Sequence, residues 1–231
     1  MDEERVEKLV YFIRHGESTQ NFGNVFQGPD SVLTERGKKQ AQFVADRTRS
    51  LGAEVVLTSP FIRARETAQT IVAATHLPLV EELLFREFSP PTSLIGKPRN
   101  TEEGRNYIRK LQANLTNPEW RYADEENYFD LHTRAITALQ HLLERPEHKI
   151  IVVTHAAFMR ALLTAMMTEG EPSGETMRQL MRFIKPMNTG ITICRYRSWA
   201  VQRNKWRLLT WNDHSHLADT DLEDPKTYDL Q

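Results

Sequence analysis

The chain has 231 residues, of which 39% are hydrophobic and 26% charged, a composition typical of a folded globular protein and not of a disordered one. Lysine and arginine (30) nearly balance aspartate and glutamate (31), and the formal net charge of -1 argues against broad nucleic-acid binding, which requires a strongly basic face. The single cysteine, Cys194, excludes an internal disulfide and a multi-thiolate metal site.

No apolar run approaches the ~20 residues that span a bilayer, and residues 1–8 form a charged leader without an apolar core. We therefore expect a cytoplasmic protein that has neither a membrane nor a nucleic acid as a partner. The pattern leaves the oligomeric state open.

The predicted elements alternate along the chain. Short apolar, β-prone runs predict strands over residues 9–14, 54–58, 78–80, 149–154, 191–196 and 206–211. Apolar residues at helical spacing predict helices after Thr34, from Ser59 to about Thr75, and over about 102–115, 128–143 and 157–167. Ser59 and Pro60 form a strong start signal, with serine as the N-cap and proline at the first helical position. This alternation predicts a three-layer α/β/α sandwich with a mainly parallel central sheet.

The whole chain, 1–231, is expected to form one domain. Residues 88–127 are irregular and rich in proline, and we interpret them as an insertion because they lack enough apolar residues for a core of their own. The acidic tail from about residue 219 is expected to fray.

Polar side chains follow three of the predicted strands. Arg14 and His15 come at the end of the first strand, Ser59 and Arg63 after the second, and His155 after the fourth. Because sites in open α/β sheets form at the carboxyl ends of the strands, two histidines and two arginines are expected to converge.

This set of side chains suits a phosphoryl group. Two guanidinium groups offer planar, bidentate donors to phosphoryl oxygens. A neutral imidazole attacks phosphorus if its other ring nitrogen is held by an acceptor, and a second, protonated imidazole donates to the oxygens. The pattern predicts phosphoryl transfer through a histidine.

At these residues the chain resembles the histidine phosphatase superfamily, the group that contains cofactor-dependent phosphoglycerate mutase and fructose-2,6-bisphosphatase. The resemblance covers nearly the whole chain, in order. It is carried by Arg14-His15-Gly16-Glu17 and Asn21, Leu33-Thr34 with Gly37, Gln40 and Ala41, Ser59-Pro60 with Arg63-Ala64 and Glu66-Thr67-Ala68, Thr154-His155, and Asn188-Thr189-Gly190-Ile191-Thr192.

The resemblance implies a phosphoglycerate mutase-like fold and a phosphohistidine formed on His15. It implies that Glu87 protonates the leaving oxygen and later activates water. It also implies a chemistry that needs no metal and no other cofactor. The phosphate pocket that it implies consists of Arg14, Asn21, Arg63, His155 and Ala156.

Two departures from the family pattern concern this pocket. Many relatives have Ser-His-Gly-Gly where this chain has Thr154-His155-Ala156-Ala157, so methyl groups tighten the space beside the phosphate. An aromatic-glycine pattern often follows the acid, whereas Phe88-Ser89-Pro90-Pro91 follows Glu87. Glu81 and Glu82 are therefore retained as rivals for the role of the acid.

Hydrolysis of a small phosphorylated metabolite is the leading hypothesis for function. The second is a phosphoglycerate mutase-type transfer, which the basic residues of the insertion favour: Lys97, Arg99, Arg105, Arg109 and Lys110. The third is an inactive phosphate-binding scaffold.

Three other features have simpler interpretations. Residues 213–216 (Asp-His-Ser-His) resemble a metal-ligand spacing but are interpreted as a polar loop facing the pocket. Cys194 lies in an apolar strand and is expected to be inert. Met159, Met166 and Met167 fit the buried face of a helix.

Overall fold

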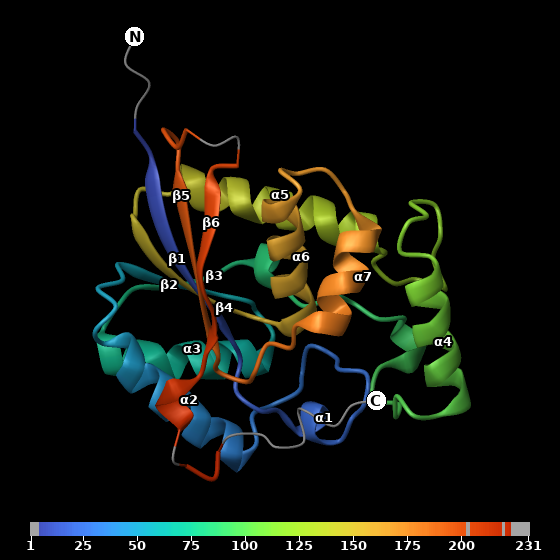
Figure 1. Ribbon diagram of the computed structural model, residues 1–231. Helices are drawn as coiled ribbons and strands as arrows, with labels where there is room; N and C mark the ends of the chain where they lie inside the picture. Colours follow the sequence, from blue (N-terminus) through green and yellow to red (C-terminus); the bar gives the residue numbers. More distant parts are fainter. Residues whose placement is uncertain (1–4, 202–203, 219, 223–231) are drawn as a thin grey trace.

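The computed structural model describes residues 5–201, 204–218 and 220–222. A six-stranded sheet forms the middle layer, and helices cover both of its faces (Figure 1). One face packs against α2 (Glu35–Thr48) and α3 (Ile62–Thr75), and the other against α5 (Tyr128–Glu144) and α6 (Ala156–Met167). This arrangement confirms the predicted α/β/α sandwich.

The sheet has the strand order β3-β2-β4-β1-β5-β6. The strands are β1 (Glu7–Arg14), β2 (Val55–Thr58), β3 (Leu79–Glu81), β4 (Lys149–Thr154), β5 (Ile191–Arg197) and β6 (Trp206–Asp213). β4 lies between β1 and β2 and runs parallel to both, and β2 runs parallel to β3. β5 and β6 complete the sheet as antiparallel strands. The carboxyl ends of β1, β2 and β4 therefore meet at one edge of the sheet.

The central strands are buried on both faces. Along β1, Val10 and Phe12 belong to the core on the α5 and α6 side, whereas Tyr11 and Ile13 belong to the core beneath α2 and α3. Successive side chains of a strand point to opposite faces, so a strand covered on both sides has a continuous apolar run. This explains why the strand signal of 9–14 and 149–154 is so plain in the sequence.

In the described part of the chain, three further helices and three 3₁₀ turns complete the fold, and two of these helices lie in segments without a predicted element. The remaining helices are α1 (Thr19–Phe22), α4 (Glu102–Ala113) and α7 (Gly174–Phe183), and the 3₁₀ turns are η1 (Leu83–Phe85), η2 (Thr92–Leu94) and η3 (Ser215–Leu217). α1 has only one turn, and α7 buries only Gly174 and Met177 within its span. α1 is too short for an apolar stripe, whereas α7 carries Met177, Leu180 and Met181 at helical spacing, so a helical signal was present in its sequence.

The start of α3 differs from the prediction. The first helical residue is Ile62 and not Pro60, and the N-cap residue Phe61 is extended and makes no side-chain cap. The Ser59 hydroxyl, which was expected to cap this helix, accepts the Phe61 N–H (3.2 Å) and lies 2.8 Å from Nε2 of His155. Ser59 thus still binds a nearby backbone N–H, but the helix begins only at Ile62, and the hydroxyl also has a tertiary partner.

The predicted insertion, residues 88–127, contains η2 and α4. Leu94 and Tyr107 from this segment form a small apolar cluster with Phe26, which comes from the loop after α1. α4 lies beside α7, where Arg178 Nη2 donates to the Gln112 carbonyl (3.3 Å; Figure 1). The insertion therefore shares its apolar cluster with the loop near Asn21 and has no separate core in the described part of the chain.

The predicted fraying begins in a segment that is only partly described. Residues 220–222 pack against α2, where Gln40 Nε2 donates to the Leu222 carbonyl (3.0 Å) and Leu222 is buried. Residues 219 and 223–231 lie outside the described residues.

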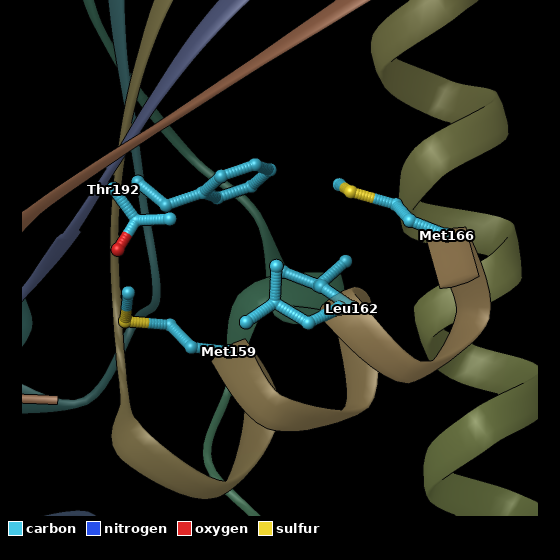
Figure 2. Close-up of a pocket in the computed structure, with 6 residues that line it drawn as sticks. Met159, Leu162, Met166 and Thr192 are labelled. Atoms are coloured by element: carbon cyan, nitrogen blue, oxygen red, sulfur yellow. The ribbon is translucent and has the colours of Figure 1, made fainter. Parts of the chain in front are cut away.

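α6 packs closely on the sheet. A void of about 10 Å³ lies at this contact. Figure 2 shows residues that line it, among them Met159, Leu162 and Met166 of α6 and Thr192 of β5. The void is apolar and at the lower limit for one water molecule, so it is a packing defect and not a ligand site. Met159 and Met166 are buried as predicted, whereas Met167 is exposed, because it lies on the solvent side at the end of the helix.

Two glycines allow a close backbone contact beside the end of β1. A Cβ on Gly16 would lie 2.5 Å from the carbonyl oxygen of Gly37, and a Cβ on Gly37 would lie 2.0 Å from that of Glu17. The loop after His15 therefore packs directly on the first turn of α2. Any side chain at either position would push this loop away.

We predict that Gly37→Ala lowers the free energy of unfolding by about 1–3 kcal/mol, because the backbone of Glu17 must shift to admit the methyl group. Gly23→Ala is the matched control, since the nearest atom to its Cβ is 3.4 Å away and its φ of -75° suits alanine. Urea denaturation measures both. Equal stability of the two variants would contradict the proposed close contact.

Candidate active site

His15 stands at the carboxyl end of β1 and is buried. Its backbone N–H donates to the Thr154 carbonyl at the end of β4 (3.0 Å). Its carbonyl accepts from Nδ2 of Asn188, in the loop before β5 (2.8 Å). Two other strand ends therefore fix the backbone of His15.

The tautomer of His15 follows from its two ring contacts. Nδ1 lies 2.7 Å from the Gly16 carbonyl, which only accepts, so Nδ1 carries the proton. Nε2 accepts from Nε of Arg63 (3.2 Å), and therefore presents a lone pair. This is the form of imidazole that acts as a nucleophile.

His155 lies next to His15, with 5.0 Å between the ring centroids. It is the N-cap residue of α6, and its Nε2 contacts the Ser59 hydroxyl. The Phe61 ring packs edge-on against it, with 5.4 Å between centroids. Nδ1 of His155 is buried and has no hydrogen-bond partner among the described residues, so it is a polar atom available to a ligand.

Burial lowers the pKa of His15 well below its ordinary value, and the positive charges of Arg63 and Arg14 lower it further. The pKa of His155 is lowered in the same direction, first by burial and then by Arg63. Both imidazoles are therefore neutral at neutral pH in the ligand-free protein. The negative charge of a bound phosphate would oppose these effects and raise the pKa of both imidazoles.

Two guanidinium groups flank the histidines. Arg63 is completely buried, and its Nη1 donates to the Gly28 carbonyl (2.8 Å). Burial lowers its pKa to about 10, against a smaller opposing contribution from the charge of Glu87. Arg14, also buried, donates through Nη1 to the Pro186 carbonyl (2.7 Å) and through Nη2 to Oδ1 of Asn21 (3.3 Å).

Glu87 reaches the same end of α6 that His155 caps. Its carboxylate accepts from the backbone N–H groups of Ala157 (3.2 Å) and Phe158 (3.0 Å) in the first turn, and from that of Phe88 (2.9 Å). Glu87 thereby satisfies N–H groups at the helix N-terminus that have no acceptor within the helix. Ala156, the first residue of the helix, lies between His155 and these donors.

The rival carboxylates have other partners. Glu81 is exposed and lies 3.8 Å from Arg65, and the half-buried Glu82 lies 3.2 Å from His141. In contrast to these two carboxylates, the predicted site residues lie together at the carboxyl edge of the sheet or at the adjoining end of α6.

The loop over residues 213–216 contacts Thr189, a residue that binds the backbone of Arg14. His216 Nε2 lies 3.1 Å from the Thr189 hydroxyl, and Thr189 N–H donates to the Arg14 carbonyl (2.9 Å). Among the described residues, no group of three or more histidine, cysteine or acidic side chains is placed to hold a metal ion. Cys194 is fully buried, and burial raises the pKa of its thiol to about 12, which makes it unreactive.

Sequence reasoning missed several contacts in the site. It placed Ser59 after the second strand and at a helix cap but predicted no contact of Ser59 with His155, and it gave Asn188 no role, although both residues occur in the blocks that carry the resemblance. The signal was present for these two residues. For Arg134, which contacts the loop that carries Glu87, the sequence offers none, because the residue lies in the middle of α5.

The model of the histidine phosphatase superfamily (branch 1) matches residues 10–214. The chain belongs to this superfamily. A relative named "Probable phosphoglycerate mutase GpmB", from Proteus mirabilis, is 30% identical over 93% of this chain and 97% of its own length. The "Uncharacterized phosphatase PhoE" of Bacillus subtilis is 26% identical over 90% of this chain and 96% of its own length.

Solved structures of this superfamily have the same fold. The mycobacterial glucosyl-3-phosphoglycerate phosphatase aligns with a TM-score of 0.72 at 21% identity, over 89% of this chain and 99% of its own. Phosphoserine phosphatase of Entamoeba histolytica, crystallised as a mutant with phosphoserine, also gives 0.72 at 21% identity, over 91% and 99%. No described helix has both the length and the apolar character that crossing a membrane would require.

The two buried imidazoles predict a pH dependence of stability. Because their pKa values are lower in the folded than in the unfolded chain, the unfolded chain binds more protons below about pH 6.5. The free energy of unfolding should therefore decrease as the pH falls below about 6.5. In His15→Gln/His155→Gln this decrease should be smaller.

Urea denaturation at about pH 7.5 and about pH 5.5 measures the difference. His148→Gln is the control, since His148 is exposed and lies at the amino end of β4, whereas His155 follows its carboxyl end. An unchanged pH dependence in the double variant would show that the two histidines are not held neutral by the pocket.

Proposed function

We propose that this protein is a phosphomonoesterase that hydrolyses a small phosphorylated metabolite through a phosphohistidine on His15. One observation carries the proposal: Nδ1 of His15 is held by the Gly16 carbonyl, and Nε2 faces Arg63 with its lone pair. A nucleophile fixed in this tautomer, among buried cationic groups, suits attack on a phosphate.

In the first step, Nε2 of His15 attacks phosphorus as the P–O bond of the ester breaks. The leaving oxygen takes a proton from the Glu87 carboxyl group, and a phosphohistidine remains. In the second step, Glu87 takes a proton from water as the water oxygen attacks phosphorus. The N–P bond breaks, inorganic phosphate leaves, and His15 and Glu87 return to their initial states.

Arg14, Arg63 and His155 would bind the oxygens of the phosphoryl group, with Asn21 holding Arg14. Bidentate guanidinium donors and a buried imidazole act most strongly in a site with little water. Enzymes accelerate phosphate-ester hydrolysis by up to about 10²¹-fold, whereas one general acid provides roughly 10²–10⁴. The covalent intermediate and the donors must therefore act together, and no metal is invoked.

Phosphoglycerate mutase activity is the second candidate, because relatives carry that name. It uses the same pocket but returns the phosphoryl group to a bound product. Rapid interconversion of phosphoglycerates with negligible phosphate release would favour it over hydrolysis. The cytoplasmic location and the absence of nucleic-acid or membrane partners stay predictions.

We predict that His15→Ala abolishes phosphate release and removes the acid-labile phosphoenzyme, because no other nucleophile replaces Nε2. Release of phosphate from a panel of sugar phosphates, phosphoglycerates and nucleotides, with a chelator present, measures turnover. His148→Ala serves as the exposed control. Full activity of His15→Ala would show that His15 is not the nucleophile. If the unmodified protein released no phosphate from any ester, the hypothesis of an inactive phosphate-binding scaffold would be favoured.

We predict that Glu87→Gln reduces kcat/KM by roughly 10²–10⁴-fold for an alkyl phosphate but much less for nitrophenyl phosphate. An alkoxide needs a proton to leave, whereas nitrophenolate leaves without one. Glutamine is close in shape to glutamate, so the fold should be kept. Equal losses with the two substrates would exclude Glu87 as the acid.

A further inference from the structure

Arg134 of α5 is a buried arginine that contacts the loop carrying Glu87. Its Nη1 donates to the carbonyls of Leu84 (2.9 Å) and Arg86 (2.7 Å), and its Nη2 to the carbonyl of Glu87 itself (3.4 Å). These carbonyls follow or end η1, where a turn leaves acceptors without intrahelical donors. One guanidinium group therefore fixes the backbone on which Glu87 stands.

Arg134 is itself held in one orientation. Its Nε donates to Oε1 of Glu126 (2.8 Å) and its Nη2 to Oε2 (2.7 Å), a bidentate pair whose side chains are 8% and 6% exposed. Such a planar fork fixes the plane of the guanidinium group as well as its position. Unlike the side chain of a solvent-exposed arginine, Arg134 therefore keeps its guanidinium group aligned with the carbonyl groups that it contacts.

The same guanidinium group also contacts the residue that binds the Glu87 carboxylate. Its Cζ lies 4.4 Å from the centroid of the Phe158 ring, and the Phe158 N–H donates to Oε1 of Glu87. Arg134 thus touches the structure around Glu87 on two sides, at its backbone and at its carboxylate donor.

We propose that Arg134 is a positioning residue for Glu87, which it orients for proton transfer by fixing the loop over residues 84–87 and the first turn of α6 together. The proposal rests on the proposed function of Glu87 as acid and base. Arg134 does not touch the reacting atoms. A proton must cross a hydrogen bond of narrow geometry, so a small shift of the loop should affect this step more than it affects attack by His15.

Arg134→Lys tests this most directly, because lysine keeps the charge but loses the bidentate pair and the fork that reaches several carbonyls. We expect kcat/KM to fall by up to about 10²-fold for an alkyl phosphate and by less than about threefold for nitrophenyl phosphate. A general loosening of the fold would lower both equally. That result would overturn the proposal.

Arg145→Lys is the matched control. Arg145 is the C-cap of the same helix and also makes a bidentate pair, with Glu147 (2.7 and 3.0 Å), but it lies at the amino end of β4, whereas His155 follows the carboxyl end of that strand. It should show no dependence on the leaving group. If it behaved like Arg134→Lys, the effect would belong to helix α5 as a whole and the proposal would fail.

A double-mutant cycle with Glu87→Gln separates this inference from the proposed function. If Arg134 acts through Glu87, Arg134→Lys should cost little further activity toward the alkyl phosphate when Glu87 is already glutamine. Additive losses would overturn the positioning role while leaving the acid in place. A Glu87→Gln variant without a leaving-group effect would instead overturn the proposed acid.

If Arg134→Lys does not unfold cooperatively, and so lacks a well-packed native structure, Glu126→Gln provides a second variant. It breaks the bidentate ion pair, and also the ion pair of Glu126 with Arg86 (3.1 Å), but leaves the contacts of Arg134 with the carbonyls available. It should show the same preference for nitrophenyl phosphate in a weaker form. Equal activity losses toward both substrates would contradict the proposal.

Discussion

The hydrogen bond between Nδ1 of His15 and the Gly16 carbonyl is the interaction on which the site depends. It places the only ring proton on the side of the backbone and leaves Nε2 able to attack. The bond requires the chain to turn sharply after β1, and that turn requires the contact between Gly16 and Gly37, where no side chain fits. The chemistry of one imidazole is therefore tied to how closely the loop packs on α2.

The surroundings of this imidazole are costly to build. Two buried guanidinium groups and two buried imidazoles share one small volume, and charged groups lose hydration when they are buried. The protein lowers this cost by keeping both histidines neutral and by giving each arginine carbonyl or amide partners. An excess of positive charge remains. It is balanced when an anion binds, so the same groups that weaken folding favour phosphate.

Much of this could be predicted from the sequence, because the strands are buried on both faces and end in unusual polar residues. The convergence of His15, Arg63 and His155 follows from parallel strands alone. The contact of the Ser59 hydroxyl with His155 could not be predicted, because the two residues lie almost a hundred positions apart in the sequence. Arg134 is similar. An arginine within a helix gives no local sign of the loop that it holds, since its partners are known only once α5 has packed.

The tautomer of His15 is the most direct test of this account. Nitrogen NMR of the protein with isotope-labelled histidine, assigned by comparison with His15→Gln, distinguishes a protonated from an unprotonated ring nitrogen. At neutral pH and without ligand we expect a neutral ring with its proton on Nδ1 and none on Nε2. A proton on Nε2, or on both nitrogens, would contradict the account, because His15 would then have no lone pair with which to attack phosphorus.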